Sequence, residues 1–347
     1  MSTALVRTLI RACLTQPNPQ NQAEVRTQLV SATAAAWEQT FITLALHRLV
    51  PLVTYTLQEW NLTDALPKKY WESMLTHYQE VKTRNTLNLL TLDGILAAMQ
   101  RKDLHPVLWK GVVLADSFYP LPATRSMADL DFSIPADEMP QVDAVFESLG
   151  FQRRDNMETE DAVYYGNTMG ILCDVHHRVR LFETTTVKNL TTSLTPKRLK
   201  CPSMTVLEPN AMLVHLVVHM DGHLDETGPI LIWILDVAYV LRQWRDQLDL
   251  ARIQQLMPSQ DSVDSLMRLV RFLQVEFGEP IPDVLAESAQ HYQPYTLDYV
   301  LRSRRLTVWG LPSVRGWMRL LACRLGIASD KGRIYPYWRD LMPWSAA

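Results

Sequence analysis

The sequence predicts an α+β protein in which a small mixed β-sheet lies between helical regions at the two ends of the chain. Residues 21–100, and the chain from Glu208 onward, carry apolar residues at helical spacing with few glycines. Short apolar runs with strand-like alternation are confined to the stretch between them. We therefore divide the chain into an N-terminal helical region (1–100), an α/β core (101–205) and a C-terminal helical region (206–347).

Composition and charge narrow the class of protein. The 347 residues are 47% hydrophobic, and the net charge of −3 gives no reason to expect strong nucleic-acid binding. The four cysteines are scattered without a CxxC pair, which argues against a disulfide framework or zinc ribbon and favours a cytoplasmic protein. The first residues make a poor signal peptide, and no apolar run of about 18 residues predicts a membrane span.

The N-terminal region is expected to hold four or five helices. The first covers residues 3–15 and ends at the proline-containing stretch 16–20. His47 and Arg48 lie in an otherwise apolar helix, and we interpret them as a partly buried polar pair.

The core pattern begins near residue 105. We expect helices over residues 112–118 and 135–149, the second ending at Gly150. The expected strands cover residues 107–109, 127–134, 151–154, 162–166 and 171–179.

The chemistry-bearing residues lie in this core. Asp129 and Asp131 alternate along the strand expected over 127–134, so their carboxylates point to the same face. Asp174 and His176 share one face of a later strand. If the two strands pair, three carboxylates converge, and such a site suits one or two Mg²⁺ or Mn²⁺ ions in phosphoryl or nucleotidyl transfer.

Basic groups lie close to these acids in sequence. Lys110-Gly111 marks a strand-to-helix turn, where a lysine and free helix N–H groups can bind phosphate. Arg125 is a second candidate phosphate ligand. The alternative to a metal site is that Asp129 is a solvated acid in a turn and that Asp131 forms a salt bridge with Arg125.

Together these motifs resemble the DNA polymerase β-like nucleotidyltransferase superfamily. They are more closely similar to a family labelled uncharacterised nucleotidyltransferase, over roughly residues 30–245, with flanks ALHRLVPL, HLVVHMDGH and WILDVAYVL. The motifs, in chain order, are Lys110-Gly111, Arg125-Ser-Met-Ala-Asp129-Leu-Asp131 and Asp174-Val-His176. One departure stands out: Lys110-Gly111 occupies the place of the superfamily's Gly-Ser turn.

The resemblance implies a metal-dependent transfer of a nucleotidyl group from an NTP such as ATP. Asp129, Asp131 and Asp174 would be the catalytic and metal-binding acids. The residues expected to contact the nucleotide or its metal are Lys110, Gly111, Arg125, Ser126 and His176. The acceptor is expected to be a peptide, a protein, a sugar or another small molecule.

Other functions stay open at this point. An enzyme with the same metal site could transfer a phosphate-linked group other than a nucleotidyl group. A different class of hypothesis is a non-catalytic module that binds a nucleotide or peptide, and a toxin–antitoxin role is a third. Convergence of Asp174 with the other two acids discriminates the enzyme from the binding module.

A histidine-bearing helix follows the core. His215, His219 and His223 recur every four residues and so share one helical face, but the glutamate of an H-E-x-x-H zinc motif is absent. Asp236 is the only acid in a strongly apolar helix, and we expect a histidine to be its partner, in a structural or a catalytic tie. The arginine- and tryptophan-rich tail within 260–347 is expected to form an amphipathic helical cap.

Overall fold

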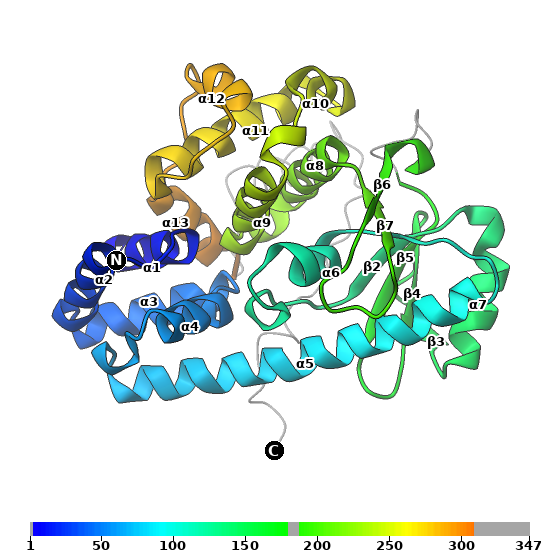
Figure 1. Cartoon of the computed structure of the whole chain (residues 1–347), viewed down its shortest axis with the longest axis horizontal. Helices are drawn as coiled ribbons and strands as arrows, with labels where there is room; N and C mark the ends of the chain where they lie inside the picture. Colours follow the sequence, from blue (N-terminus) through cyan, green and yellow to red (C-terminus); the bar gives the residue numbers. More distant parts are fainter. Residues whose placement is uncertain (1–2, 180–186, 309–347) are drawn as a thin grey trace, which may run out of the picture.

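The predicted α+β class is confirmed. A computed structural model describes residues 3–179 and 187–308, with a seven-stranded mixed sheet between helices at both ends of the sequence (Figure 1). The order of elements follows the predicted three regions, and their folding as separate domains stays a prediction. Residues 309–347, which include most of the tryptophan-rich tail, lie outside the described residues.

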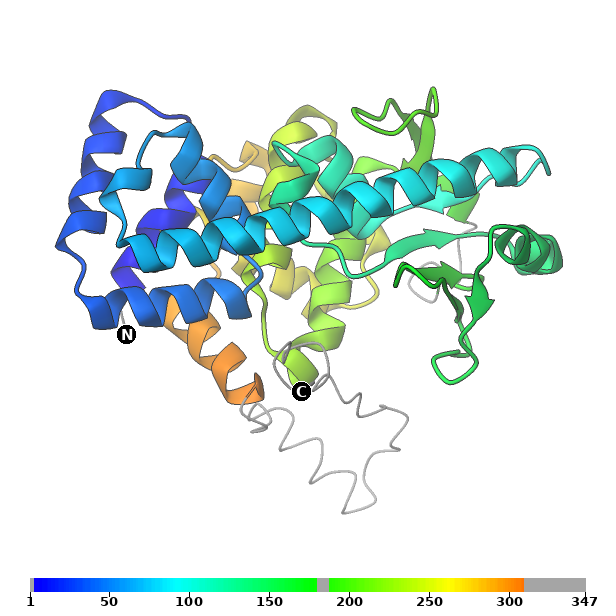
Figure 2. The same ribbon diagram turned by 90° about the horizontal axis from the view of Figure 1, so that it is seen from below.

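The N-terminal region contains the expected number of helices. Side-chain caps start two of them: Asn18 accepts a hydrogen bond from the Asn21 amide at 2.9 Å, and Thr33 accepts one from the Ala36 amide at 3.2 Å. The last helix is 33 residues long and leaves this bundle to run beside the core (Figures 1 and 2). The bounds are α1 Thr3–Leu14, α2 Pro19–Ser31, α3 Ala34–Leu46, α4 Val50–Glu59 and α5 Lys68–Gln100.

The sheet contains two strands that the sequence did not reveal. Its order is β3-β4-β5-β2-β1-β7-β6. The bounds are β1 Val107–Leu108, β2 Leu130–Ser133, β3 Gln152–Arg153, β4 Ala162–Gly166, β5 Leu172–His176, β6 Thr191–Leu194 and β7 Met204–Leu207. Strands β6 and β7 were not predicted, because β6 is short, polar and partly exposed, and β7 pairs in parallel with a strand almost a hundred residues earlier.

The central pair of strands positions the acids. β2 and β5 run in parallel, and Asp131 is the direct register partner of Asp174. On the opposite face, Phe132 stacks at 6.2 Å on Phe146 of α7 (Met139–Ser148). One face of the β2–β5 pair is therefore apolar and covered by α7, and the other carries the carboxylates.

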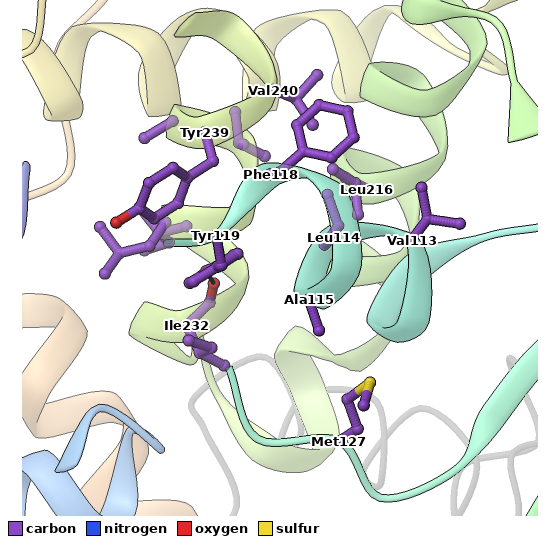
Figure 3. Packing of buried hydrophobic residues seen from close by; sticks show 14 of the residues in the cluster. Val113, Leu114, Ala115, Phe118, Tyr119, Met127, Leu216, Ile232, Tyr239 and Val240 are labelled. Carbon is purple, nitrogen blue, oxygen red and sulfur yellow. Dashed lines mark hydrogen bonds between the residues drawn. The ribbon is translucent and has the colours of Figure 1, made fainter. Parts of the chain in front are cut away.

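The predicted helix over 112–118 is a short α-helix, α6 (Lys110–Val113), continued by the π-helical turn η2 (Leu114–Phe118). Figure 3 shows η2 packed between Leu216 of α8 (Pro209–Thr227) and Tyr239 and Val240 of α9 (Leu231–Gln243). The Tyr119 and Tyr239 rings lie 4.2 Å apart. The Lys110 turn thus rests on the C-terminal helices.

The C-terminal helices also pack back on the N-terminal ones. Arg7 of α1 donates from Nε to Glu276 at 2.8 Å, which joins the two helical regions. The remaining helices are α10 Leu250–Leu256, α11 Gln260–Phe272, α12 Asp283–Ala289 and α13 Leu297–Val308.

Within residues 3–179 and 187–308, no single helix is long and apolar enough to span a bilayer. Helices α3 and α4 meet the length and composition criteria only as a pair, and they bend by 118° at their junction.

Candidate active site

Three carboxylates converge on one face of the β2–β5 pair. Asp131 and Asp174 face each other across the two strands and are only 5% and 6% exposed. Asp129 lies just before β2, in a bend instead of the predicted strand, and is half-buried. Burial, followed by the neighbouring charge of Asp131, raises the pKa of Asp129 to about 7. Such repulsion calls for a cation at the site.

Among the described residues, two of the three predicted metal-binding acids lie with His176 in a group that could hold a metal ion. Asp131, Asp174 and His176 each offer a ligand atom, and these atoms lie within 4.8 Å of one another. Asp174 Oδ1 and His176 Nε2 are 3.2 Å apart, and both are buried without a hydrogen bond of normal geometry to any described residue. Carboxylate oxygens suit Mg²⁺ or Mn²⁺, so these buried, unsatisfied atoms fit a divalent cation.

The ionisation of Asp174 follows from its neighbours. Burial alone would raise its pKa, but His176 and Lys110 hold the pKa of Asp174 below its usual value. Asp174 therefore stays charged more readily than Asp129.

Lys110 supplies the nearest cation. Its Nζ donates to Asp131 Oδ1 at 3.0 Å. Burial would lower the pKa of Lys110, but the charges of Asp131 and Asp174 raise it, so the ammonium stays protonated. The Lys110 backbone has φ 48°, a left-handed conformation that costs a non-glycine residue about 1 kcal/mol. A lysine in this strained backbone conformation places its ammonium against Asp131.

Gly111 is required by a close approach of Arg125. A Cβ atom at Gly111 would lie 2.9 Å from Arg125 Nη1. Any larger residue would push the guanidinium out of its place. The turn therefore combines a lysine that reaches the acids with a glycine that admits an arginine.

Arg125 is held by a buried ion pair. Its Nε and Nη2 donate to the two oxygens of Asp236 at 2.8 and 2.7 Å, and the Tyr119 hydroxyl donates to Asp236 Oδ1 at 2.8 Å. The predicted histidine partner of Asp236 is therefore wrong. The alternative pairing of Asp131 with Arg125 is also wrong, because Lys110 takes that place. A role of Arg125 in phosphate binding stays a prediction, with only Nη1 left outside the Asp236 pair.

A buried asparagine that the sequence analysis missed fixes the loop before the acids. Asn85 of α5 donates from Nδ2 to the carbonyl oxygens of Pro122 and Arg125 at 2.6 and 2.7 Å. A sequence signal was present, since Asn85 falls on the buried face of an amphipathic helix, where a polar residue needs a partner. Helices α5 and α9 thus hold the acidic loop from two sides.

The histidine helix borders the site through Trp109. The predicted shared face is confirmed by ring contacts: His215 and His219 are 6.1 Å apart, and His219 and His223 are 4.7 Å apart. His215 stacks on Trp109 at 4.8 Å, and Trp109 meets His176 edge-on at 5.1 Å. Burial, then the charge of Lys110, lowers the pKa of His215 and of His219, so both imidazoles are neutral.

Ser126 follows Arg125 in the loop. Its hydroxyl is buried and makes no hydrogen bond to the described residues, while its carbonyl accepts a 3.4 Å contact from Arg125 Nη1. Its predicted contact with the nucleotide stays a prediction.

Comparison with known proteins assigns the class. The family model described as uncharacterised nucleotidyltransferase matches residues 33–275, so the chain belongs to this family. The resemblance stated from the motifs is thereby confirmed, and the protein is an enzyme of the nucleotidyltransferase class. No curated protein matches the chain significantly.

Several solved structures are distantly similar. Two are structures of the antibiotic-resistance factor ANT(2'')-Ia, one in solution and one a crystal structure with adenylyl-2''-tobramycin. They have TM-scores of 0.39 and 0.38 and 15% and 14% identity, and cover 50% and 48% of this chain and 90% and 93% of theirs. An antigenic nucleotidyltransferase-like protein from Paracoccidioides brasiliensis has a TM-score of 0.39 and 15% identity, over 59% of this chain and 97% of its own. At such low sequence identities and TM-scores, these structures identify neither the donor nor the acceptor of this protein.

The buried ion pair predicts a large stability effect. Asp236→Ala leaves the Arg125 guanidinium buried and unpaired, and should lower the free energy of unfolding by about 3–5 kcal/mol. Asp64→Ala is the matched control, because its pair with Arg26 is exposed; it should cost less than about 1 kcal/mol. Urea unfolding measures both, and equal effects would contradict the structural role of the pair.

Asp129 predicts a pH dependence of stability. Because its pKa is raised to about 7 in the folded chain, from about 4 when unfolded, its ionisation destabilises the metal-free fold progressively between these pH values, and fully above pH 7. With EDTA present, wild type should lose stability relative to Asp129→Asn between pH 5 and 8, by a few kcal/mol at most. A wild-type-to-variant difference that is the same at both pH values would show that the carboxyl titrates normally.

Proposed function

We propose that this protein transfers a nucleotidyl group from an NTP to an acceptor hydroxyl, with Mg²⁺ or Mn²⁺ bound by the three acids. The observation that carries the proposal is the pairing of β2 with β5, which sets Asp131 opposite Asp174. The convergence of Asp174 with the other acids is the outcome that favours the enzyme over a non-catalytic binding module.

The roles of the side chains follow from the geometry. Asp131 and Asp174 would hold the metal, with His176 either a further ligand or the group that orients Asp174, and Asp129 would complete the site. A bound divalent ion supplies charge stabilisation at the phosphate oxygens and orients the reacting groups. Lys110 would exchange its contact with Asp131 for the donor phosphates.

The reaction is an in-line substitution at the α-phosphorus of the donor. The acceptor oxygen forms the new P–O bond, and the bond to the pyrophosphate leaving group breaks. The acceptor's proton passes to a carboxylate of the site, for which we propose Asp174, which is charged at neutral pH.

The acceptor is proposed only by class: a peptide, a protein, a sugar or another small molecule with a free hydroxyl. A cytoplasmic location, where NTPs are available, belongs to the same proposal. Its support is that Cys13, Cys173 and Cys201 form no disulfide with one another within residues 3–179 and 187–308, as expected in a reducing compartment.

Label transfer tests the proposed activity. The protein is incubated with each labelled NTP, Mg²⁺ or Mn²⁺, and candidate acceptors. The Asp129→Ala/Asp131→Ala double variant should lower transfer by about 10³-fold or more, because it removes metal ligands that supply several kcal/mol of transition-state stabilisation.

The matched control for this experiment is Asp137→Asn, an exposed acid on the segment that follows β2. This variant should transfer label at the wild-type rate. Label transfer that survives the double variant would sink the mechanism.

A further inference from the structure

Two buried polar atoms of the acidic site face each other without forming a hydrogen bond. Asp174 Oδ1 and His176 Nε2 are 3.2 Å apart, and both lack a hydrogen bond to any residue in 3–179 or 187–308. Asp174 is 6% exposed and His176 is half-buried. Because it is unfavourable to leave buried polar atoms unsatisfied, the two atoms are suited to one shared partner that is not part of the described chain.

The spacing of these atoms fits two ligands of one metal ion. Ligands at adjacent corners of an octahedron, each about 2.1 Å from the ion, lie about 3 Å apart. The 3.2 Å between Asp174 Oδ1 and His176 Nε2 is close to that value, and a ligand atom of Asp131 completes a group within 4.8 Å. A hydrogen bond needs alignment of the N–H with the acceptor as well as a short distance, and this pair has only the distance.

Ring contacts fix the orientation of the His176 imidazole. Trp109, which is 1% exposed, meets His176 at 5.1 Å with 82° between the ring planes. The indole is itself held by His215 of α8, which stacks on it at 4.8 Å with 6° between the planes. The Trp109 backbone amide donates to the Asp131 carbonyl at 3.4 Å, beside the second acid of the group. The histidine helix α8 thus supports His176 through one tryptophan.

An imidazole ligand changes which cation such a site prefers. Mg²⁺ is bound almost entirely by oxygen atoms and keeps several waters, whereas an imidazole nitrogen is a ligand for transition metals. A site with three carboxylates alone would suit Mg²⁺ and Mn²⁺ alike. The group of Asp131, Asp174 and His176 combines two carboxylates with one imidazole, and this donor set favours a divalent transition metal.

We propose that His176 Nε2 is a ligand of the cation in this site, and that the site therefore selects a transition-metal ion such as Mn²⁺ over Mg²⁺. His215 is a positioning residue in this arrangement, because it acts on His176 through the Trp109 ring. The inference rests on the proposed function, since it names the kind of metal ion that the proposed transferase site uses. It also gives the histidine helix a role in that site.

The test is Mn²⁺ binding to the full chain, without nucleotide or acceptor. Pulsed electron paramagnetic resonance of the bound Mn²⁺ detects a directly coordinated nitrogen, and labelling with ¹⁵N-histidine assigns that nitrogen to an imidazole. Affinities for Mn²⁺, and for Mg²⁺ by competition, are measured for wild type, His176→Gln, His215→Ala and His215→Phe. His105→Gln is the matched control, because the His105 side chain is 72% exposed.

Wild type should show a histidine nitrogen bound to Mn²⁺, and His176→Gln should lose this signal. His176→Gln should bind Mn²⁺ about 10-fold or more weakly but Mg²⁺ less than about 3-fold more weakly, because its amide oxygen suits Mg²⁺. His215→Ala should weaken Mn²⁺ binding about 2- to 10-fold, whereas His215→Phe keeps a ring for the stack and should bind as wild type does. His105→Gln should also match wild type.

Mn²⁺ bound to wild type without a histidine nitrogen overturns the inference and leaves the proposed function standing. This outcome needs no variant, so it decides the matter even if His176→Gln fails to fold. An equal loss of Mn²⁺ and Mg²⁺ affinity in His176→Gln also overturns the inference, and equal Mn²⁺ binding by wild type and His215→Ala overturns the role of the stack. A wild-type protein that binds neither cation overturns both the inference and the proposed function.

Discussion

The repulsion between the carboxylates on one face of β2 and β5 is the constraint on which the rest of the site depends. The parallel register places Asp131 against Asp174, and Asp129 enters from the preceding bend. Burial makes this arrangement unfavourable without a cation, as the raised pKa of Asp129 indicates. Lys110 neutralises part of the negative charge of the carboxylates, and a divalent ion would neutralise the rest. The position of that lysine, in a strained turn, follows from this requirement.

The helical regions surround the site and also hold its residues in position. The long helix α5 fixes the loop through Asn85, and α9 fixes the same loop through Asp236. The ring of Trp109 connects the turn to α8 through His215. Catalytic groups must be held to within a fraction of an ångström, and here their supports come from segments more than a hundred residues apart. The small sheet by itself does not contain these contacts.

Much of this arrangement was predictable from the sequence, for identifiable reasons. Helical periodicity and short apolar strands predicted the α+β class, and alternation in β5 placed Asp174 and His176 on one face. Pairing between residues far apart in sequence was not predictable. The position of β7 beside β1 was therefore missed, and the predicted partner of Asp236 was wrong. Left-handed backbone at Arg48 and Lys110 was hidden as well, because neither residue type signals it.

The central claim is that the acids of β2 and β5 form a divalent-cation site. Mn²⁺ binding, followed by electron paramagnetic resonance of the free ion, tests it without any need to know the donor or the acceptor. Wild type should bind Mn²⁺, and Asp174→Asn should bind it at least about 10-fold more weakly, because a neutral amide replaces a charged ligand. Equal binding of Mn²⁺ by wild type and Asp174→Asn, or no binding by wild type, would contradict the account.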